Sequence, residues 1–260
     1  MIPYKDIFFK IEKTLKEQSS FTEKEFNDTV EYFKYFEYNK LRDNDYYHLM
    51  VDITFYSGMR ANIVTSKRSV FRGYFDYYSK VCSYDEDKIN EILNDKNMIR
   101  NKAKIKACIS NAKTFKNIID EYGSFENYIS SFKLDKSFEN LLLFREEIIQ
   151  RFSYIGNITS YHFMTDIGLP VLKPDRVNRR IFRRLGLIKS DDQLFETVIQ
   201  GRKMSEETGL PIRYIDIILV KYGQIGRDDT FGLEDGICLE KNPKCELCGI
   251  REYCEESEFL

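Results

Sequence analysis

The feature that most constrains this chain is a run of four cysteines close to its C-terminal end. Cys238, Cys245, Cys248 and Cys254 are separated by six, two and five residues. Four thiols in one short loop are too compressed to form two independent disulfides, but they can converge on a single tetrahedral centre. All-thiolate centres hold either zinc or an iron–sulfur cluster, and zinc ribbons usually bring two Cys-x2-Cys knuckles, whereas this loop has one. The spacing therefore favours a cluster, with a zinc knuckle as the alternative.

The same loop shows a family resemblance. With Pro243 and Lys244 directly before its second cysteine, it resembles the [4Fe-4S] loop of the endonuclease III family of helix-hairpin-helix DNA glycosylases. The resemblance implies that the four cysteines hold a [4Fe-4S] cluster. It also implies that the chain acts on double-stranded DNA that contains a damaged base.

Length and composition are compatible with such a protein. With 260 residues, 42% of them hydrophobic, the chain can bury the core of one large domain or of two smaller ones that share a cleft. It has no signal peptide, no apolar run of about 18 residues and no short-period repeat. We therefore expect a cytoplasmic monomer, nucleoid-associated in a prokaryote, that makes no membrane contact. Cys82 and Cys108, which lie far from the cysteine run, are expected to be small buried side chains.

Charge is unevenly distributed along the chain. The net charge of −2 does not by itself indicate a nucleic-acid binder. Basic residues gather at 67–72, 100–106 and 173–189, while acidic residues gather at 85–87 and 228–235. Attraction to phosphate acts over a screening length of about 8 Å. A local basic face can therefore bind DNA even though the net charge of the chain is close to zero.

Helical periodicity runs through almost all of the chain, and no strand is convincing. Ile7, Ile11 and Leu15 form one apolar stripe, and residues 22–25 spell a capping box for the next helix. An aromatic-rich helix over residues 46–56 is followed by a Ser-Gly-Met sequence that breaks the pattern. These patterns predict an all-α fold.

A second resemblance covers the central part of the chain. Residues 98–132 begin with MIRNKAKI, continue through NAKTF and then read EYGSF. Together with the upstream Ser-Gly-Met sequence, they look like the 3-methyladenine DNA glycosylase I family. The resemblance implies that Met59 enters the base stack as a wedge, and that Asn101 and Lys102 contact the phosphate backbone. Arg60, beside Met59, is a further expected DNA contact. The chain departs from that family in having no tryptophan for the base pocket and only two histidines where the family has a zinc site.

The residues of the base pocket cannot be assigned from that family, because the family's pocket glutamate aligns with either Asp52 or Ile53 of this chain. Asp52 lies in an apolar helix, where it is either the pocket acid or a satisfied buried carboxylate. Phe55 and Tyr56 follow it, and aromatic rings can stack on an electron-poor cationic purine. The candidate pocket is therefore Asp52, Phe55 and Tyr56.

A helix over residues 141–152, a break and a further helix from Thr159 predict a helix-hairpin-helix with its hairpin at 152–160. Gly156 is expected to supply the positive φ of the reversal, and amides at the start of the second helix to hold a phosphate. Gly156, Asn157 and Thr159 are the expected DNA contacts. Only one of the two glycines usual in this hairpin is present, and read alone a glycine between helices is more often an ordinary turn.

The position of the lyase nucleophile is occupied by an apolar residue. Endonuclease III relatives that cleave the strand carry a lysine two residues after the second hairpin glycine, where this chain has Ile158. An apolar side chain cannot form a Schiff base, so the sequence predicts a monofunctional glycosylase. Lys173 lies nearby in the chain and could still provide the amine nucleophile of a lyase reaction.

Asp175 is the predicted catalytic residue. Residues 168–175, GLPVLKPD, end the second hairpin helix as in endonuclease III relatives, in which a catalytic aspartate opens the next helix. Asp175 also suits the N-cap of that helix, and the two roles are compatible. A carboxylate at a helix N-terminus can support a sugar cation or polarise water. The next helix can present its arginines outward along DNA, although some are expected to bind acids within the protein: Arg176, Arg180, Arg183 and Arg184.

Together these patterns predict an all-α helix-hairpin-helix DNA glycosylase with DNA in a cleft between two helical domains. The cluster domain is expected to contain residues 1–30 and 165–260, and the helical barrel domain residues 31–164. The expected reaction of base excision repair is hydrolysis of an N-glycosidic bond after the nucleotide is flipped out, with an alkylated purine such as 3-methyladenine as the first choice of substrate. The alternatives are a bifunctional glycosylase/lyase on oxidised or otherwise modified bases, a catalytically silent DNA-binding module and a redox-sensing iron–sulfur DNA-binding protein.

Overall fold

The computed structural model describes residues 2–35 and 40–256 of the chain. Within these ranges the regular structure consists of thirteen α-helices and two short 3-10 helices, with one antiparallel bridge between Asp228 and Leu233 and no strand. The predicted all-α fold class is therefore confirmed. None of the helices in the described part of the chain combines the length and apolarity needed to cross a membrane.

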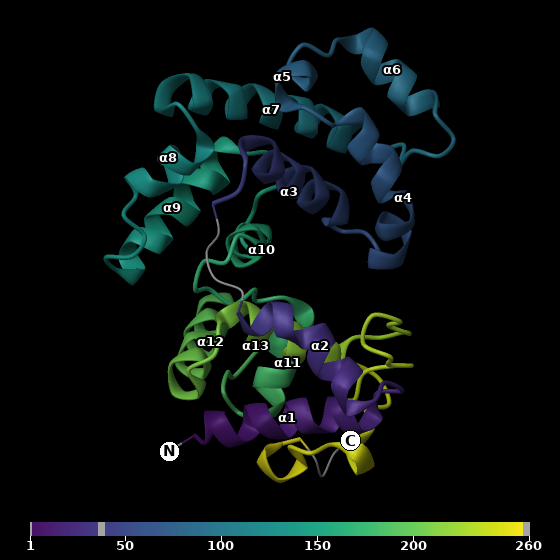
Figure 1. Cartoon of the computed structure of the whole chain (residues 1–260), viewed down its shortest axis with the longest axis vertical. Coiled ribbons are helices and arrows are strands. Elements are labelled where there is room, and N and C mark those ends of the chain that lie inside the picture. The colour runs from purple at the N-terminus through teal and green to yellow at the C-terminus, as the bar shows by residue number, and fades with distance from the viewer. Residues whose placement is uncertain (1, 36–39, 257–260) are drawn as a thin grey trace. The chain divides into compact units, whose positions relative to one another are not determined.

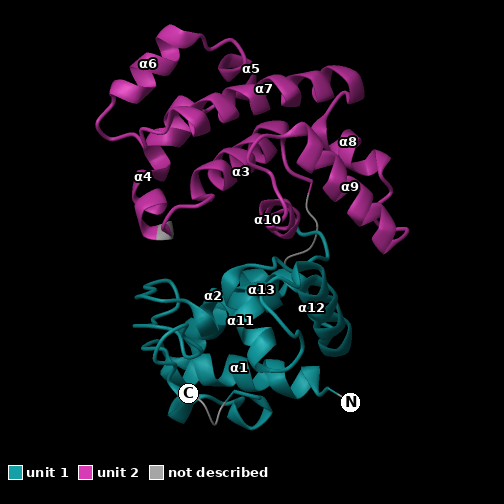
Figure 2. Ribbon diagram, turned by 180° about the vertical axis from the view of Figure 1, so that it is seen from behind, with its two compact units in different colours: residues 1–39, 168–260 teal, residues 40–167 magenta. Residues whose placement is uncertain are grey.

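The helices form two compact units, which Figure 2 shows in different colours. Unit 1 contains residues 1–39 and 168–260, and unit 2 contains residues 40–167. The domain boundaries expected from the sequence, after residues 30 and 164, fall inside two helices, and the structure divides the chain beyond the ends of both. A helix packs as one piece, so its whole length belongs with the core that its apolar stripe covers.

Unit 1 is built from helices that come from both ends of the chain (Figure 1). Helix α1 packs against α12 and α13, and α13 also packs against α2 and α11. The elements of unit 1 are α1 (Tyr4–Gln18), α2 (Glu23–Lys34), α11 (Arg176–Arg184), α12 (Leu194–Thr208), α13 (Ile212–Gly223), η1 (Cys245–Leu247) and η2 (Arg251–Tyr253).

The core of unit 1 follows the stripes read from the sequence. Ile7, Ile11 and Leu15 are at most 2% exposed, which confirms the apolar face of α1. Burying such a side chain contributes about 1.5–3 kcal/mol, so this stripe helps to hold α1 in the core. Thr22 and Glu25 form the predicted capping box of α2.

Unit 2 is arranged around its longest helix, α7, which packs against α3, α5, α6 and α8. The rings of Phe115 on α7 and Phe125 on α8 stack with their centroids 4.4 Å apart. Such contacts between aromatic rings stabilise the unit beyond the burial of their area. The helices of unit 2 are α3 (Asp43–Tyr56), α4 (Ala61–Tyr74), α5 (Tyr78–Val81), α6 (Glu86–Asn94), α7 (Lys102–Tyr122), α8 (Phe125–Ser131), α9 (Phe138–Arg151) and α10 (Thr159–Asp166).

Candidate active site

Asp175 occupies the N-cap of α11. Its Oδ1 atom accepts hydrogen bonds from the backbone amides of Val177 at 2.9 Å and Asn178 at 3.0 Å. Its Oδ2 atom lies 3.3 Å from Nζ of Lys173, and the side chain is 23% exposed. The predicted N-cap role is confirmed. The carboxylate is thus oriented by the protein and still accessible, as the support of a developing cation requires.

A buried amide and a buried carboxylate hold the turn that contains Asp175. Nδ2 of Asn178 donates to the carbonyl oxygen of Lys173 at 2.8 Å and to Oδ1 of Asp216 at 3.0 Å. Asp216 lies on α13, where its Oδ2 atom accepts a hydrogen bond from Nη1 of Arg213 at 2.8 Å. Buried charged groups are stable only when they are paired and hydrogen-bonded. These contacts therefore fix the start of α11 against α13.

Two arginines of α11 are buried beneath the cysteine loop, residues 237–254. Arg180 donates to the carbonyl oxygens of Gly223 and Cys238, and burial lowers the pKa of its guanidinium. Arg184 donates to Sγ of Cys238 at 3.2 Å and to the carbonyl oxygen of Leu239 at 2.8 Å. The expectation that these two arginines can face outward along DNA is wrong, because their planar groups donate to buried carbonyl oxygens of Gly223 and of the loop. Nε of Arg184 also lies 3.4 Å from Oε2 of Glu256, as expected of an arginine bound by an acid within the protein.

The other three arginines of α11 are more accessible, and one of them, Arg179, donates to the carbonyl oxygen of Asp191. Arg183 pairs with the carboxylates of Asp191 and Glu256, as expected of an arginine bound by acids within the protein. Arg176 is exposed in the first turn of α11, directly after Asp175. Its contact with DNA stays a prediction.

The cysteine loop contains η1 and η2, which begin or end beside its last three cysteines. The hydroxyl of Tyr222 donates to Sγ of Cys248 at 3.2 Å, as Arg184 does to Cys238. Over residues 2–35 and 40–256, no three His, Cys, Asp or Glu side chains are grouped as a metal site would need. Hydrogen bonds to sulfur of this kind typically surround metal-bound thiolates. Two of the four thiols thus accept hydrogen bonds of the kind that metal-bound thiolates receive, and the [4Fe-4S] cluster stays a prediction.

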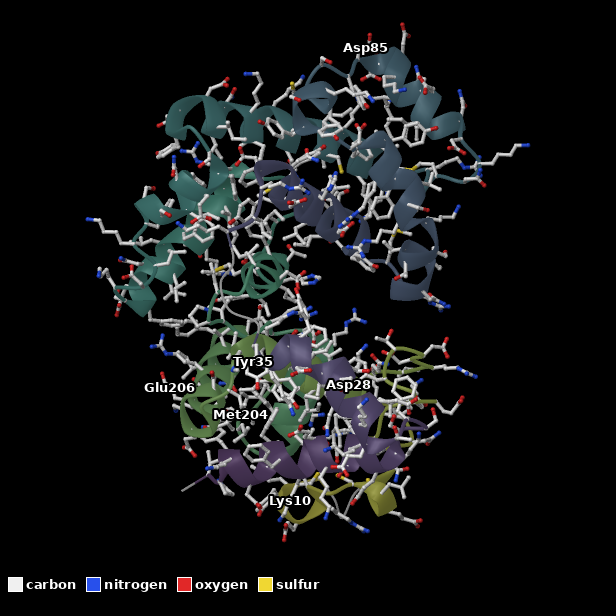
Figure 3. The ribbon with its side chains drawn as sticks, viewed as in Figure 1. Lys10, Asp28, Tyr35, Asp85, Met204 and Glu206 are labelled. Atoms are coloured by element: carbon white, nitrogen blue, oxygen red, sulfur yellow. The ribbon has the colours of Figure 1, made fainter. Side chains whose placement is uncertain are left out.

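The N-terminal helix α1 packs against the cysteine loop. Lys10, which Figure 3 labels where α1 meets the C-terminal segment, pairs with Glu252, and its Nζ atom lies 5.0 Å from the ring centroid of Tyr253. A Cβ atom on Gly249 would come within 2.2 Å of Oγ1 of Thr14 on α1. Glycine at this position thus permits the loop to lie directly against the helix.

The hairpin between α9 and α10 is closed by Thr159. Its hydroxyl donates to the carbonyl oxygen of Tyr154 at 2.9 Å and accepts from the amide of Gly156 at 2.6 Å. The left-handed conformation of the hairpin is adopted by Tyr154, with φ +65°, and not by Gly156. The expectation for Gly156 is wrong, because the chain reverses two residues earlier. Asn157 is exposed, and Nη2 of Arg145 donates to its carbonyl oxygen at 3.1 Å.

The turn after α3, residues 57–60, contains the predicted wedge, and we call it the wedge turn. Gly58 adopts φ +69°, a conformation that favours glycine, so the predicted break at this residue is confirmed. Met59 is half-buried and Arg60 is exposed. Lys104, in the first turn of α7, donates to the last carbonyl groups of α3. The insertion of Met59 into DNA stays a prediction.

Asn101 and Lys102, the expected phosphate contacts, lie at the start of α7. Oδ1 of Asn101 accepts a hydrogen bond from the amide of Lys104 at 3.1 Å, so Asn101 is the N-cap of this helix. Nζ of Lys102 lies 3.3 Å from Oε2 of Glu86, and Lys106 pairs with the same carboxylate. Glu86 therefore competes with any phosphate for Lys102.

Asp52 is the satisfied buried carboxylate that the sequence left as one of two possibilities. Its two oxygen atoms accept hydrogen bonds from the guanidinium groups of Arg68 and Arg72 on α4. Hydrogen bonding to Asp52 raises the pKa of Arg68. The carboxylate thereby joins α3 to α4, which accounts for its burial without a base pocket.

The aromatic members of the candidate pocket differ in exposure. Phe55 is 0% exposed, and its ring stacks on that of Phe71 with the centroids 4.5 Å apart. The predicted pocket role of Phe55 does not fit this burial in the core. Tyr56 is partly exposed, and its hydroxyl lies 2.8 Å from Oγ1 of Thr65.

The sequence alone does not single out Lys104, Tyr154 or Asp216. Asp216 interrupts the apolar stripe of α13, and a charged residue in such a stripe is a signal of a paired buried carboxylate. Lys104 lies among other lysines that face solvent, and Tyr154 has no local pattern that indicates a left-handed conformation. Both roles depend on neighbours that are distant in the sequence.

Solved structures with a similar fold are DNA glycosylases. The 8-oxoguanine glycosylase/lyase of Methanocaldococcus jannaschii, solved with a 15mer DNA containing 8-oxoguanine, is 16% identical, with a TM-score of 0.55 over 82% of this chain and 94% of that one. Endonuclease III trapped in a covalent intermediate with DNA is 14% identical, with a TM-score of 0.55 over 90% of this chain and 94% of that one. The 8-oxoguanine DNA glycosylase of Thermotoga maritima is 15% identical, with a TM-score of 0.52 over 83% and 95%.

The family model for methyladenine glycosylases matches residues 26–173, which is more than half of the chain. The match includes all of unit 2 and the loop that leads to Asp175. The similar structures place the two units within the helix-hairpin-helix DNA glycosylase fold. The chain belongs to the methyladenine glycosylase family and is a DNA N-glycosylase of base excision repair.

Proposed function

We propose that this glycosylase removes alkylated purines such as 3-methyladenine from double-stranded DNA by hydrolysis. The main support for the substrate class is the family match across residues 26–173. Alkylated purines already carry positive charge and leave easily, so the enzyme needs little protonation of the leaving group. It can then discriminate mainly by the shape of its pocket.

Asp175 is the proposed catalytic residue. Its carboxylate, held by two backbone amides and by Lys173, would support the positive charge that develops on the sugar and orient the attacking water. This role requires the damaged nucleotide to leave the duplex, since a stacked base cannot be reached.

Double-stranded DNA is the proposed partner of a monomeric protein. The structures of endonuclease III and of the Methanocaldococcus jannaschii enzyme contain DNA, which supports this partner. We propose Met59 as the wedge, and as further DNA contacts Arg60, Asn101, Lys102, Gly156, Asn157, Thr159 and Arg176.

Cys238, Cys245, Cys248 and Cys254 are the proposed ligands of a [4Fe-4S] cluster. Their spacing, the donors that Tyr222 and Arg184 direct at sulfur, and the contact of the loop with α1 support the proposal. When bound, such a cluster cross-links its loop and holds it in one shape. We propose that it acts structurally, because the hydrolysis of a glycosidic bond requires no electron transfer.

A single-turnover panel of duplexes tests the proposed reaction. The panel contains methylated purines, oxidised pyrimidines, 8-oxoguanine pairs and uracil, each assayed directly and after alkali. We expect release of 3-methyladenine or 7-methylguanine, with strand breaks only after alkali because Ile158 offers no amine. Strand breaks without alkali on oxidised pyrimidines would overturn both the substrate and the monofunctional assignment.

One observation favours a second candidate, a glycosylase that also cleaves the strand. Nζ of Lys173 lies 3.3 Å from Oδ2 of Asp175, and an amine beside a carboxylate is the pair that Schiff-base chemistry uses. Borohydride treatment of the protein with abasic DNA separates the candidates. A trapped covalent complex that Lys173→Gln abolishes would establish the lyase, and its absence would support hydrolysis alone.

A further inference from the structure

Three carbonyl groups at the end of α3 and one aromatic ring in the hairpin surround the ammonium group of Lys104. The side chain is only 3% exposed. Its Nζ atom donates to the carbonyl oxygens of Thr54 at 2.5 Å, Phe55 at 3.3 Å and Ser57 at 2.6 Å. It also lies 4.9 Å from the ring centroid of Tyr154 in the hairpin. Lys104 therefore contacts both the end of α3 and the hairpin that precedes α10.

The contact with α3 fixes the residues directly before the wedge. Ser57 is the first residue of the wedge turn, and the next two are Gly58 and Met59. The last carbonyl groups of a helix have no partner within the helix, and Lys104 provides one from α7. Burial lowers the pKa of Lys104, so placing its charge here costs desolvation energy that an apolar residue would avoid.

The contact with the hairpin involves a residue in a disfavoured conformation. Tyr154 has φ +65°, which a non-glycine residue rarely adopts, and its side chain remains 37% exposed. Strained conformations persist where the surrounding structure holds them, and they often mark functional sites. Thr159 holds the carbonyl group of Tyr154, and Lys104 lies against its ring. A glycine would suit the backbone better but would remove that contact with Lys104.

We propose that Lys104 and Tyr154 are positioning residues that couple the wedge turn to the hairpin. The inference rests on the proposed function, in which Met59 enters the stack while the hairpin holds a phosphate. To push a nucleotide out of a paired duplex, Met59 must keep its position relative to the hairpin that holds the phosphate backbone. The coupling therefore matters when the base is paired and stacked, and it matters little when the base is already unpaired.

Two variants and two DNA substrates test the coupling in the full-length protein. Lys104→Met removes the charge, Tyr154→Gly removes the ring, and Lys113→Met at an exposed position of α7 is the matched control. Single-turnover excision of 7-methylguanine is measured in a fully paired duplex and in a bulge. We expect each variant to lower the ratio of the paired to the bulged rate about tenfold, and Lys113→Met to leave it unchanged.

The Tyr154→Gly variant keeps the test decisive even if Lys104→Met unfolds, because glycine suits φ +65° and should not destabilise the hairpin. An unchanged ratio for Tyr154→Gly would overturn the proposal and leave the tyrosine as a turn residue. A lower melting temperature for Lys104→Met with an unchanged ratio would likewise reduce Lys104 to a helix cap.

A second readout separates this proposal from the proposed function. Fluorescence of 2-aminopurine next to the target nucleotide reports unstacking on binding, whether or not a base is released. We expect both variants to give a smaller fluorescence increase than the parent protein on paired DNA. If the parent excises no alkylated base but the variants still show this loss, the coupling stands and the substrate assignment fails. An equal increase for parent and variants would overturn the coupling.

Discussion

Lys173 and Asp175 form an ion pair in which Nζ of the lysine lies 3.3 Å from Oδ2 of the aspartate. The other oxygen of the same carboxylate accepts hydrogen bonds from two backbone amides of α11. Each oxygen atom is thus held by a different partner, and the carboxylate cannot rotate without losing one of them. The geometry of Asp175 is therefore set before any DNA arrives, which is the condition for electrostatic support of a transition state.

We expect Asp175→Asn to bind duplex DNA like the parent while its single-turnover excision rate falls by about 10²-fold or more. The carboxylate acts on a charge that exists only in the transition state, so its loss appears in the chemical step. Asparagine remains a good N-cap, so α11 should stay intact. The measurement is base release with enzyme in excess, alongside a binding titration.

Asp85→Asn is the matched control, because Asp85 caps α6 through a hydrogen bond from the amide of Lys88 at 2.9 Å and lies in unit 2 (Figure 3). It should excise like the parent. If Asp175→Asn also excises at the parent rate, Asp175 is only a cap, and the catalytic group must be sought elsewhere.

The features that the sequence predicted correctly are those set by local rules. The buried stripe of α1, the capping box of α2 and the N-cap role of Asp175 depend on residues within one or two helical turns. A short window of sequence contains all the residues that decide them. The helix-hairpin-helix fold was predicted from the resemblance of short motifs to known families.

The features that the sequence did not predict depend on contacts between distant residues. Lys104 and its acceptor at Thr54 are 50 residues apart, and Arg180 and Cys238 are 58 residues apart. Nothing near an arginine in the sequence tells whether its guanidinium will meet solvent or a distant carbonyl oxygen. Phe55 illustrates the same limit, since the position of Phe71 on α4 decides that its ring is buried.

We expect Glu86→Gln to increase affinity for duplex DNA about two- to fivefold at low salt and to steepen the salt dependence by about one ion. Glu86 pairs with Lys106 and Lys102, and we propose that Lys102 contacts a phosphate. Removing the competing carboxylate makes that ammonium available to DNA. Titrations at several salt concentrations give both quantities, and Glu121→Gln at an exposed position of α7 should change neither.

The pH dependence of the same pair provides an independent check. Hydrogen bonds from Lys106 and Lys102 hold the pKa of Glu86 below its usual value of 4.5. The contribution of the pair to stability is therefore present above that value, and it is lost as the pH falls through the lowered pKa. Between pH 6 and 8 the parent and Glu86→Gln should thus differ in DNA affinity by a constant factor. A difference that varies across this range would contradict the assignment.

We expect Asp216→Asn to lower the free energy of unfolding by about 3 kcal/mol, because it replaces the buried carboxylate that pairs with Nη1 of Arg213 by a neutral amide. It also weakens the acceptor for Asn178, which holds the turn of Asp175. Chemical denaturation gives the value. Glu206→Gln, in an exposed pair with Arg202 on α12, is the control and should cost no more than about 0.5 kcal/mol. Equal effects of the two substitutions would show that the buried network contributes no more than a surface pair.

Protein purified without oxygen should be brown and contain about four irons per chain, since four thiolates at this spacing suit a [4Fe-4S] cluster. Cys245→Ser should lose the iron and bind DNA more weakly, because the cluster would no longer cross-link the cysteine loop. Cys82→Ser is the matched control, as Cys82 lies in unit 2, where its thiol donates to the carbonyl oxygen of Ser79. It should retain the parent iron content, measured together with acid-labile sulfide. One zinc per chain without iron or sulfide would instead establish the zinc knuckle, while the same loss of DNA binding on removing Cys245 would still show that the loop needs its metal.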